Sequence, residues 1–180
     1  MSETPSSMVP LGTSIPTFTL PDATGKMWEV SQNMSGTLVV FMCNHCPYVI
    51  HVAQTLASLH DICKKNGIEM VGINSNDIQT YPEDSPENMV LAAKEHGWEF
   101  PYLFDESQEV AKKFNATCTP DAFLFDSSGM LIYRGELDET RPNCGISDGI
   151  SIHLAILSML NGKPLTSPQN PAVGCNIKWK

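Results

Sequence analysis

The sequence predicts an α/β fold, in which helices flank a central mixed β-sheet. Residues Thr37–Met42 form a short, almost wholly apolar run after a glycine, which is typical of a strand buried on both faces. Apolar side chains then recur every three or four residues from Pro47 to Gly67, as in an amphipathic helix. The apolar run Ile68–Ile73 follows, and a strand–helix–strand unit of this length indicates parallel pairing of its strands.

Two additions to this unit are predicted. An N-terminal β-hairpin is indicated by Phe18–Leu20 and Met27–Val30, which flank the turn-forming sequence Asp-Ala-Thr-Gly. After the second buried strand, a helix over residues 85–97 begins with a serine cap and a first-turn proline. A short strand at Pro101–Phe104 completes this inserted helix and strand.

The C-terminal half supplies the remaining elements. A short helix around Val110–Phe114 precedes two apolar runs, Ala122–Phe125 and Met130–Tyr133, which the turn Asp-Ser-Ser-Gly joins into an antiparallel hairpin. This hairpin makes the predicted sheet mixed. The last helix, Ile150–Leu160, is apolar nearly all round, so a homodimer contact or the C-terminal tail could cover its outer face.

Length and composition favour one folded domain. The 180 residues fit a single domain over 1–180, with a core of about residues 10–165 and a tail over 166–180. Hydrophobic residues make up 42% and charged residues 17%, which is ordinary for a globular protein. Because the net charge is −9 and no Lys/Arg run occurs, we expect no nucleic-acid partner. No apolar stretch approaches a membrane span and the N-terminus lacks a signal pattern, so a cytoplasmic protein without membrane contact is expected.

The sequence Cys-Asn-His-Cys at residues 43–46 carries the strongest functional signal. We place Cys43 at the mouth of the helix that follows, where unpaired N–H groups and the helix dipole lower a thiol pKa. Cys43 is therefore expected to be the exposed attacking thiol, and Cys46 the resolving thiol that attacks the mixed disulfide on Cys43. A protonated His45 between them would stabilise the thiolate further. Such a pair needs no bound cofactor and no metal.

A metal site is the main alternative for this spacing. Two cysteines separated by two residues form half of a zinc site, which needs two further ligands, typically a second pair of the same kind. The chain has no second pair, so a site could be completed only through an accident of folding, by one of the residues His51, His60, Cys63, Cys118, Cys144 and Cys175. Attachment of a c-type haem requires a histidine after the second cysteine, and Pro47 stands there.

The other cysteines carry weaker signals. Cys63 continues the apolar stripe of its helix and is expected to be an inert core thiol. Cys144 and Cys175 could bridge to each other or stay unbridged, because spacing alone does not decide pairing.

The motifs, taken in order, resemble those of the thioredoxin superfamily. The resemblance rests on the strand Leu-Val-Val-Phe, on Cys-Asn-His-Cys-Pro at residues 43–47, and on Thr119-Pro120 ahead of the second hairpin. The sequence is similar to a peroxiredoxin-like group related to alkyl hydroperoxide reductase and thiol-specific antioxidant. That group carries Cys-Asn-His-Cys-Pro-Tyr and a Gly-Cys-Asn-Ile-Lys-Trp tail, here residues 43–48 and 174–179. A thioredoxin-like fold over about residues 10–165 is therefore implied.

The resemblance also implies a second wall of the site. Pro120 is expected to be cis and to face the cysteine pair, while Thr119 would offer backbone groups to an extended substrate strand. Cys118 would lie on the loop facing the pair, where it could act as an additional redox thiol or simply fill the loop.

Two departures from related families bear on mechanism. Thioredoxins carry a buried aspartate on the strand before the first cysteine, at the position of Thr37 in this chain. Proton transfer would then fall to His45, Glu69 or a water molecule. Peroxiredoxins carry Pro-x-x-x-Thr-x-x-Cys, and neither Cys43 nor Cys46 ends such a sequence.

We therefore predict a thiol-disulfide oxidoreductase that exchanges disulfides through Cys43 and Cys46. Its substrates would be protein or small-molecule disulfides, and a thioredoxin or glutathione system would supply the reducing thiol. Two alternatives stay open. One is a thiol-dependent peroxidase that uses the same pair, and the other is a metal-binding module that uses Cys43, Cys46 and a nearby histidine.

Overall fold

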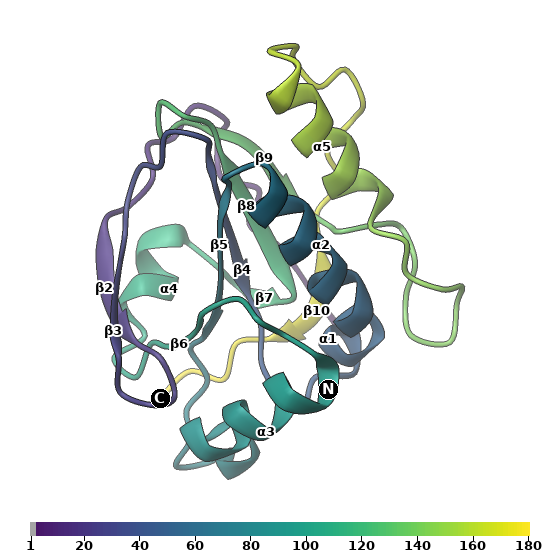
Figure 1. Cartoon of the computed structure of the whole chain (residues 1–180). Helices are drawn as coiled ribbons and strands as arrows, with labels where there is room; N and C mark the ends of the chain where they lie inside the picture. The colour runs from purple at the N-terminus through teal and green to yellow at the C-terminus, as the bar shows by residue number, and fades with distance from the viewer. Residues whose placement is uncertain (1–2) are drawn as a thin grey trace.

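The computed structural model describes residues 3–180 and contains a five-stranded mixed sheet at its centre (Figure 1). In sheet order its strands are β6 (Tyr102–Phe104), β5 (Glu69–Asn74), β4 (Thr37–Phe41), β8 (Asp121–Phe125) and β9 (Leu131–Gly135). The first three strands are parallel, whereas β8 and β9 run antiparallel to their neighbours. The predicted mixed sheet with a buried central strand is therefore confirmed.

Helices cover both faces of this sheet. They are α1 (Pro47–His51), α2 (Ala53–Lys65), the 3-10 helix η1 (Pro82–Asp84), α3 (Pro86–His96), α4 (Glu109–Phe114) and α5 (Ile150–Leu160). Side chains from α2, α3 and α5 share the hydrophobic core on one face, and α4 packs on the other (Figure 1). The helix expected from Pro47 to Gly67 exists, but it is interrupted at Val52 and divided into α1 and α2.

The two predicted additions are also present. The hairpin of β2 (Phe18–Pro21) and β3 (Met27–Val30) forms a separate two-stranded sheet and packs on the α4 face. The inserted helix and strand are α3 and β6. Ser85 caps α3 by accepting the backbone N–H of Asn88, and a left-handed Gly97 ends the helix.

A third sheet joins segments from the two ends of the chain. It consists of β1 (Glu3–Pro5), β10 (Val173–Asn176) and β7 (Cys118–Thr119), with β10 in the middle and both pairings antiparallel. No strand was predicted in the tail, which therefore enters the fold as β10, the yellow strand of Figure 1. A Cβ at Gly174 would lie 2.0 Å from the carbonyl oxygen of Thr119, so this close approach of β10 to β7 requires glycine.

One apolar face of α5 stays exposed. Ile150, Leu154, Leu157 and Leu160 are all exposed, while β10 pairs with β1 and β7. The tail therefore does not cover this face, and that alternative is wrong; a homodimer contact stays a prediction. Within residues 3–180, no helix has both the length and the hydrophobicity that crossing a bilayer requires.

Candidate active site

The cysteine motif lies between the central strand and the first helix. Cys43 follows β4, and Cys46 is the N-cap residue of α1, whose first residue is Pro47. Both residues are buried, with 1% of Cys43 and 0% of Cys46 exposed. The expectation of an exposed Cys43 at the helix mouth is therefore wrong. Proline favours the first helical position, so the helix starts after the motif and Cys46 occupies its N-terminus.

Thr119 contacts both cysteines, and its peptide bond with Pro120 is cis as the resemblance implied. The Sγ of Cys43 lies 3.4 Å from the hydroxyl oxygen of Thr119, and the Sγ of Cys46 lies 3.4 Å from its carbonyl oxygen. On its other side, the backbone of Thr119 pairs with Cys175 of β10. A substrate strand could therefore pair with Thr119 only after β10 had moved.

The two thiols of the motif share a proton unequally. A hydrogen bond from the Cys43 thiol lowers the pKa of Cys46 to about 5, and hydrogen bonds from Cys175 and from the backbone N–H of Val49 act in the same direction. The same bond between the cysteines, together with burial and the carboxylate of Asp84, raises the pKa of Cys43 well above its usual range. Within the pair these hydrogen bonds and the N-terminus of α1 favour the negative charge on Cys46, whereas the carbonyl oxygen of Thr119, which accepts a hydrogen bond from the Cys46 thiol, opposes it.

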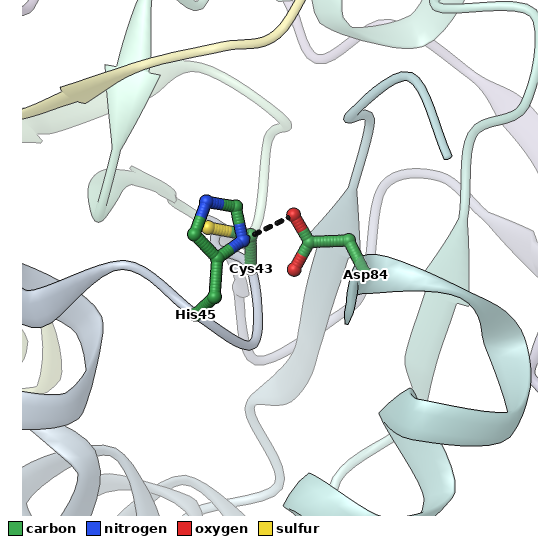
Figure 2. Close-up of side chains that lie close together, drawn as sticks. All are labelled: Cys43, His45 and Asp84. Atoms are coloured by element: carbon green, nitrogen blue, oxygen red, sulfur yellow. Dashed lines mark ion pairs between the residues drawn. The ribbon is translucent and has the colours of Figure 1, made fainter. Parts of the chain in front are cut away.

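Asp84 is the functional residue that sequence reasoning missed. It ends η1, its side chain is fully buried, and its Oδ2 lies 2.7 Å from Nδ1 of His45 (Figure 2). This contact raises the pKa of His45, against the opposing effect of burial. Although burial alone would raise its pKa, Asp84 is held below its usual range by its contacts with His45 and Asn76. An imidazolium–carboxylate pair beside Cys43 is thus favoured.

Further contacts fix the carboxylate of Asp84 against the motif. Its Oδ1 accepts the backbone N–H of Asn44 at 2.8 Å, and its Oδ2 accepts the side-chain amide of Asn76 at 2.7 Å. The hydroxyl of Tyr102 donates to the side chain of Asn44 at 2.9 Å. These bonds cross from the inserted segment to the middle of the motif. Because they join residues far apart in the chain, no local sequence pattern marks Asp84.

Cys43, His45 and Asp84 also offer three potential metal-ligand atoms within 4.8 Å of one another (Figure 2). In a tetrahedral zinc site with bonds of about 2.0 to 2.3 Å, two ligand atoms lie about 3.3 to 3.7 Å apart. The 2.7 Å between Nδ1 of His45 and Oδ2 of Asp84 is shorter than this and matches a close ion pair. Both carboxylate oxygens of Asp84 already accept N–H groups. The geometry therefore fits an ion pair better than a zinc centre.

Of the other cysteines, Cys63, Cys144 and Cys175 differ in burial and in their contact with the motif. Cys63 lies in the core as expected, and burial raises its pKa to about 12. Cys144 is exposed and Cys175 is buried, and no disulfide joins any cysteines within residues 3–180. Cys175 instead contacts the sulfur of Cys46.

Cys118 is buried on β7, where burial raises its pKa above the usual range. Its Sγ lies 4.0 Å from the carbonyl oxygen of Ala172. Successive side chains of a strand point to opposite sides, and the neighbouring Thr119 points toward Cys43. The structure thus gives the proposed additional redox role of Cys118 no supporting contact with the pair.

A buried aspartate is present, but not where thioredoxins carry one. Asp121 follows Pro120 on β8, is 1% exposed, and neither of its carboxylate oxygens has a hydrogen bond from residues 3–180. Burial raises its pKa well above the usual range. Glu69, proposed above for proton transfer, pairs with Thr37 at the far end of β4 from Cys43. Of the protein groups proposed for proton transfer, only His45 lies at the site.

A family model described as the AhpC/TSA family matches residues 11–134. The chain belongs to the AhpC/TSA family. The matched range includes the cysteine motif, Asp84, the cis proline and the central sheet as far as Arg134 of β9, so the AhpC/TSA match covers the site except for β10. No curated protein matches the chain.

Solved structures extend the comparison beyond the AhpC/TSA match. An uncharacterized conserved protein from Geobacillus kaustophilus is 46% identical, with a TM-score of 0.96 over 100% of this chain and 97% of that one. A hypothetical protein from Sinorhizobium meliloti 1021 is 39% identical, with a TM-score of 0.94 over 98% of each chain. A thiol:disulfide interchange protein of the thioredoxin family from Chlorobium tepidum TLS is 19% identical, with a TM-score of 0.66 over 83% of this chain and 97% of that one. This last similarity supports the thioredoxin-like fold.

Proposed function

We propose that this protein is a thiol-disulfide oxidoreductase whose redox centre is the pair Cys43 and Cys46. One observation carries the proposal: two hydrogen-bonded thiols, of which Cys46 lies at a helix N-terminus, both contact the residue before a cis proline. The lowered pKa of Cys46 keeps one thiolate in the pair at neutral pH. A thiolate is the nucleophile of disulfide exchange, so the pair is prepared for that reaction.

The shared proton suggests how the two thiols divide the work. Cys43 attacks a substrate disulfide, and its proton passes along the hydrogen bond to Cys46. A bond forms between Cys43 and one substrate sulfur, while the other substrate sulfur leaves as a thiolate. Cys46 then loses the proton, attacks Cys43 and releases the second substrate sulfur. The products are a Cys43–Cys46 disulfide and two reduced substrate sulfurs, which carry the proton of the pair.

We place the substrate in a hollow beside the motif. Asn44 and His45 line a hollow of about 350 Å³ at the edge of α3, together with the exposed apolar side chains of Ile50 and Leu91. This lining suits a disulfide carried by a peptide or a small molecule. A thiol donor, such as a thioredoxin or glutathione system, would return the pair to its reduced state.

Trapping the mixed disulfide tests the proposal and its division of roles. Cys46→Ser protein is incubated with insulin or glutathione disulfide, and the adduct is mapped by mass spectrometry. A stable adduct on Cys43 is expected, because the resolving thiol has been removed. Wild-type protein should reduce insulin with a thiol donor and form the Cys43–Cys46 disulfide.

Two further variants control this trap. Cys144→Ser changes an exposed cysteine and should leave insulin reduction unchanged. The double variant Cys43→Ser/Cys175→Ser lacks both thiols that contact Cys46. A stable adduct on Cys46 in this double variant, with no adduct on Cys43 in Cys46→Ser, would reverse the roles. No adduct in either variant, together with no insulin reduction by wild type, would contradict the proposal.

A thiol-dependent peroxidase is the second candidate, and membership of the AhpC/TSA family favours it. The peroxiredoxin signature around the cysteine is absent, however, and the two arginines of the second half are engaged elsewhere. Arg134 donates to Val9 and Gln169, whereas Arg141 pairs with Glu136. Hydrogen peroxide consumption, coupled to the same thiol donor, separates the candidates. Fast peroxide turnover with negligible insulin reduction would favour the peroxidase.

A further inference from the structure

The C-terminal strand places a third cysteine at the redox pair. Cys175 is the residue of β10 that pairs directly with Thr119 of β7. Thr119 in turn contacts both Cys43 and Cys46. Cys175 therefore belongs to the same buried cluster as the two motif cysteines.

Cys175 contacts Cys46 in two ways. Its thiol and its backbone N–H both form hydrogen bonds with the Cys46 sulfur. The sulfur of Cys46 thus has two thiol neighbours, Cys43 and Cys175. A sulfur with two thiol neighbours can form a disulfide with either one.

We propose that Cys175 is a third redox thiol, which exchanges with Cys43 for the sulfur of Cys46. The proposal rests on the function proposed above, because it adds a second reaction of the Cys43–Cys46 disulfide. That disulfide is converted into a Cys46–Cys175 disulfide, and Cys43 becomes a thiol again. The oxidised protein would then hold its disulfide against β7 and present a reduced Cys43.

The exchange needs no outside oxidant. The sulfur of Cys175 attacks Cys46, the bond between Cys43 and Cys46 breaks, and a bond between Cys46 and Cys175 forms. Cys43 leaves as a thiolate and takes up the proton that Cys175 loses, so the number of disulfides and protons is unchanged. In the reduced protein burial raises the pKa of Cys175, and the hydrogen bond with Cys46 and the negative charge there raise it further. A disulfide at Cys46 carries no charge, so the effect of that charge is absent from the oxidised protein.

The test uses Cys43→Ser, in which Cys175 is the remaining thiol in contact with Cys46. The reduced full-length variant is treated with glutathione disulfide, quenched with acid, alkylated with N-ethylmaleimide, digested and mapped by mass spectrometry. Glutathione is expected to join Cys46 transiently and then to be released as the Cys46–Cys175 disulfide forms. Cys43→Ser/Cys175→Ser should keep glutathione on Cys46, while Cys43→Ser/Cys144→Ser should behave like Cys43→Ser.

Disulfide mapping of oxidised wild-type protein provides a second measurement that does not depend on a variant. Peptides linked through Cys46 and Cys175 should appear beside peptides linked through Cys43 and Cys46. Glutathione that stays on Cys46 while Cys175 is fully alkylated would overturn the inference, as would an unmodified Cys46 in Cys43→Ser. Failure of the proposed function has a different signature, which is loss of insulin reduction by wild type. A Cys46–Cys175 disulfide found in such a protein would leave this inference standing.

Discussion

At the scale of single residues, Asp84 controls the charge next to the redox pair. It contacts His45 directly and accepts a hydrogen bond from the backbone N–H of Asn44, so it acts on the motif through both residues between the cysteines. Its negative charge raises the pKa of Cys43, whereas the imidazolium that it stabilises supplies a compensating positive charge. Asp84 is thus a positioning residue that fixes both the geometry and the charge of the motif.

Asp84→Asn should lower the pKa of His45 toward its ordinary value, because the carboxylate is the main cause of the upward shift. The raised folded-state pKa means that the pair stabilises the fold fully below about pH 6.5, the value for an unfolded histidine. This contribution is lost as pH rises through the folded-state pKa. An NMR titration of His45 measures the shift directly, and the alkaline limb of the pH profile for insulin reduction should move to lower pH with it.

Glu83→Gln is the matched control for this change. Glu83 precedes Asp84 in η1 and is exposed, and its charge acts on His45 only as a minor cause. Solvent screens such a charge, so its removal should lower the His45 pKa much less than removal of Asp84. Equal shifts in the two variants would show that the buried contact is not the source of the raised pKa.

At the scale of elements, local patterns predicted the structure wherever a segment buries its own regular face. The apolar run of β4, the periodic stripe of α2 and the serine–proline start of α3 all produced correct predictions. The strand β10 has the sequence Val-Gly-Cys-Asn, which lacks a regular alternation of apolar and polar residues. It is a strand because β1 and β7 lie on either side of it, and that pairing is a tertiary effect.

The same division applies to the candidate site. The motif sequence located Cys43, Cys46 and His45, and the resemblance correctly implied a cis Pro120. The predicted exposure of Cys43 failed because the start of α1 and the packing of Thr119 bury it. Asp84 and Cys175 were missed as members of the site, since each reaches it from a distant segment whose own sequence gives no sign of the contact. Only the folded structure brings Asp84 into contact with Asn76, and Cys175 into pairing with Thr119.

Gly174→Ala tests how closely β10 must approach β7. The added Cβ would lie 2.0 Å from the carbonyl oxygen of Thr119 and 2.7 Å from its carbonyl carbon, so β10 has to move away. Overpacking of this kind costs about 1 to 3 kcal/mol, which urea unfolding would measure as a lower free energy of unfolding. Cys175 should also react faster with N-ethylmaleimide, because its strand no longer packs tightly against Thr119.

Gly162→Ala separates this effect from a general cost of replacing glycine. A Cβ at Gly162 meets no atom within 4 Å, although the residue has a φ of +62° and the variant would carry some backbone strain. This control could lose stability, but the reactivity of Cys175 should not change. If Gly174→Ala leaves both stability and Cys175 reactivity unchanged, β10 does not depend on the close approach.

At the scale of the whole molecule, β1 and β10 come from near opposite ends of the described chain and pair with each other, and β10 reaches the cysteine pair. β1 and β10 lie side by side, and β10 carries Cys175 onto the pair between β4 and α1 (Figure 1). The C-terminal segment therefore belongs to the candidate active site. Shortening the chain at the apparent end of the core, near residue 165, would remove a thiol that contacts Cys46.

Asp121 makes the stability of the whole fold depend on pH. Its folded-state pKa is raised by burial, so the folded protein keeps a proton that the unfolded chain loses above about pH 4. The stability associated with this proton is complete below that pH and is lost as pH rises toward the folded-state pKa. Asp121→Asn keeps the shape and cannot ionise, so its free energy of unfolding relative to wild type should increase as pH rises from about 4 to about 7.

Urea unfolding of both proteins across this pH range measures the difference, which can grow by at most about 1.4 kcal/mol per pH unit for one proton. Asp61→Asn makes the same chemical change at an exposed position of α2 and should give a nearly constant difference. The trend is decisive, because a carboxylate stabilised by a cation would be ionised in both the folded and the unfolded protein above about pH 4, and the difference between Asp121→Asn and wild type would then stay nearly constant across this range. A rising difference would instead show that the fold tolerates the buried carboxyl group by keeping it protonated.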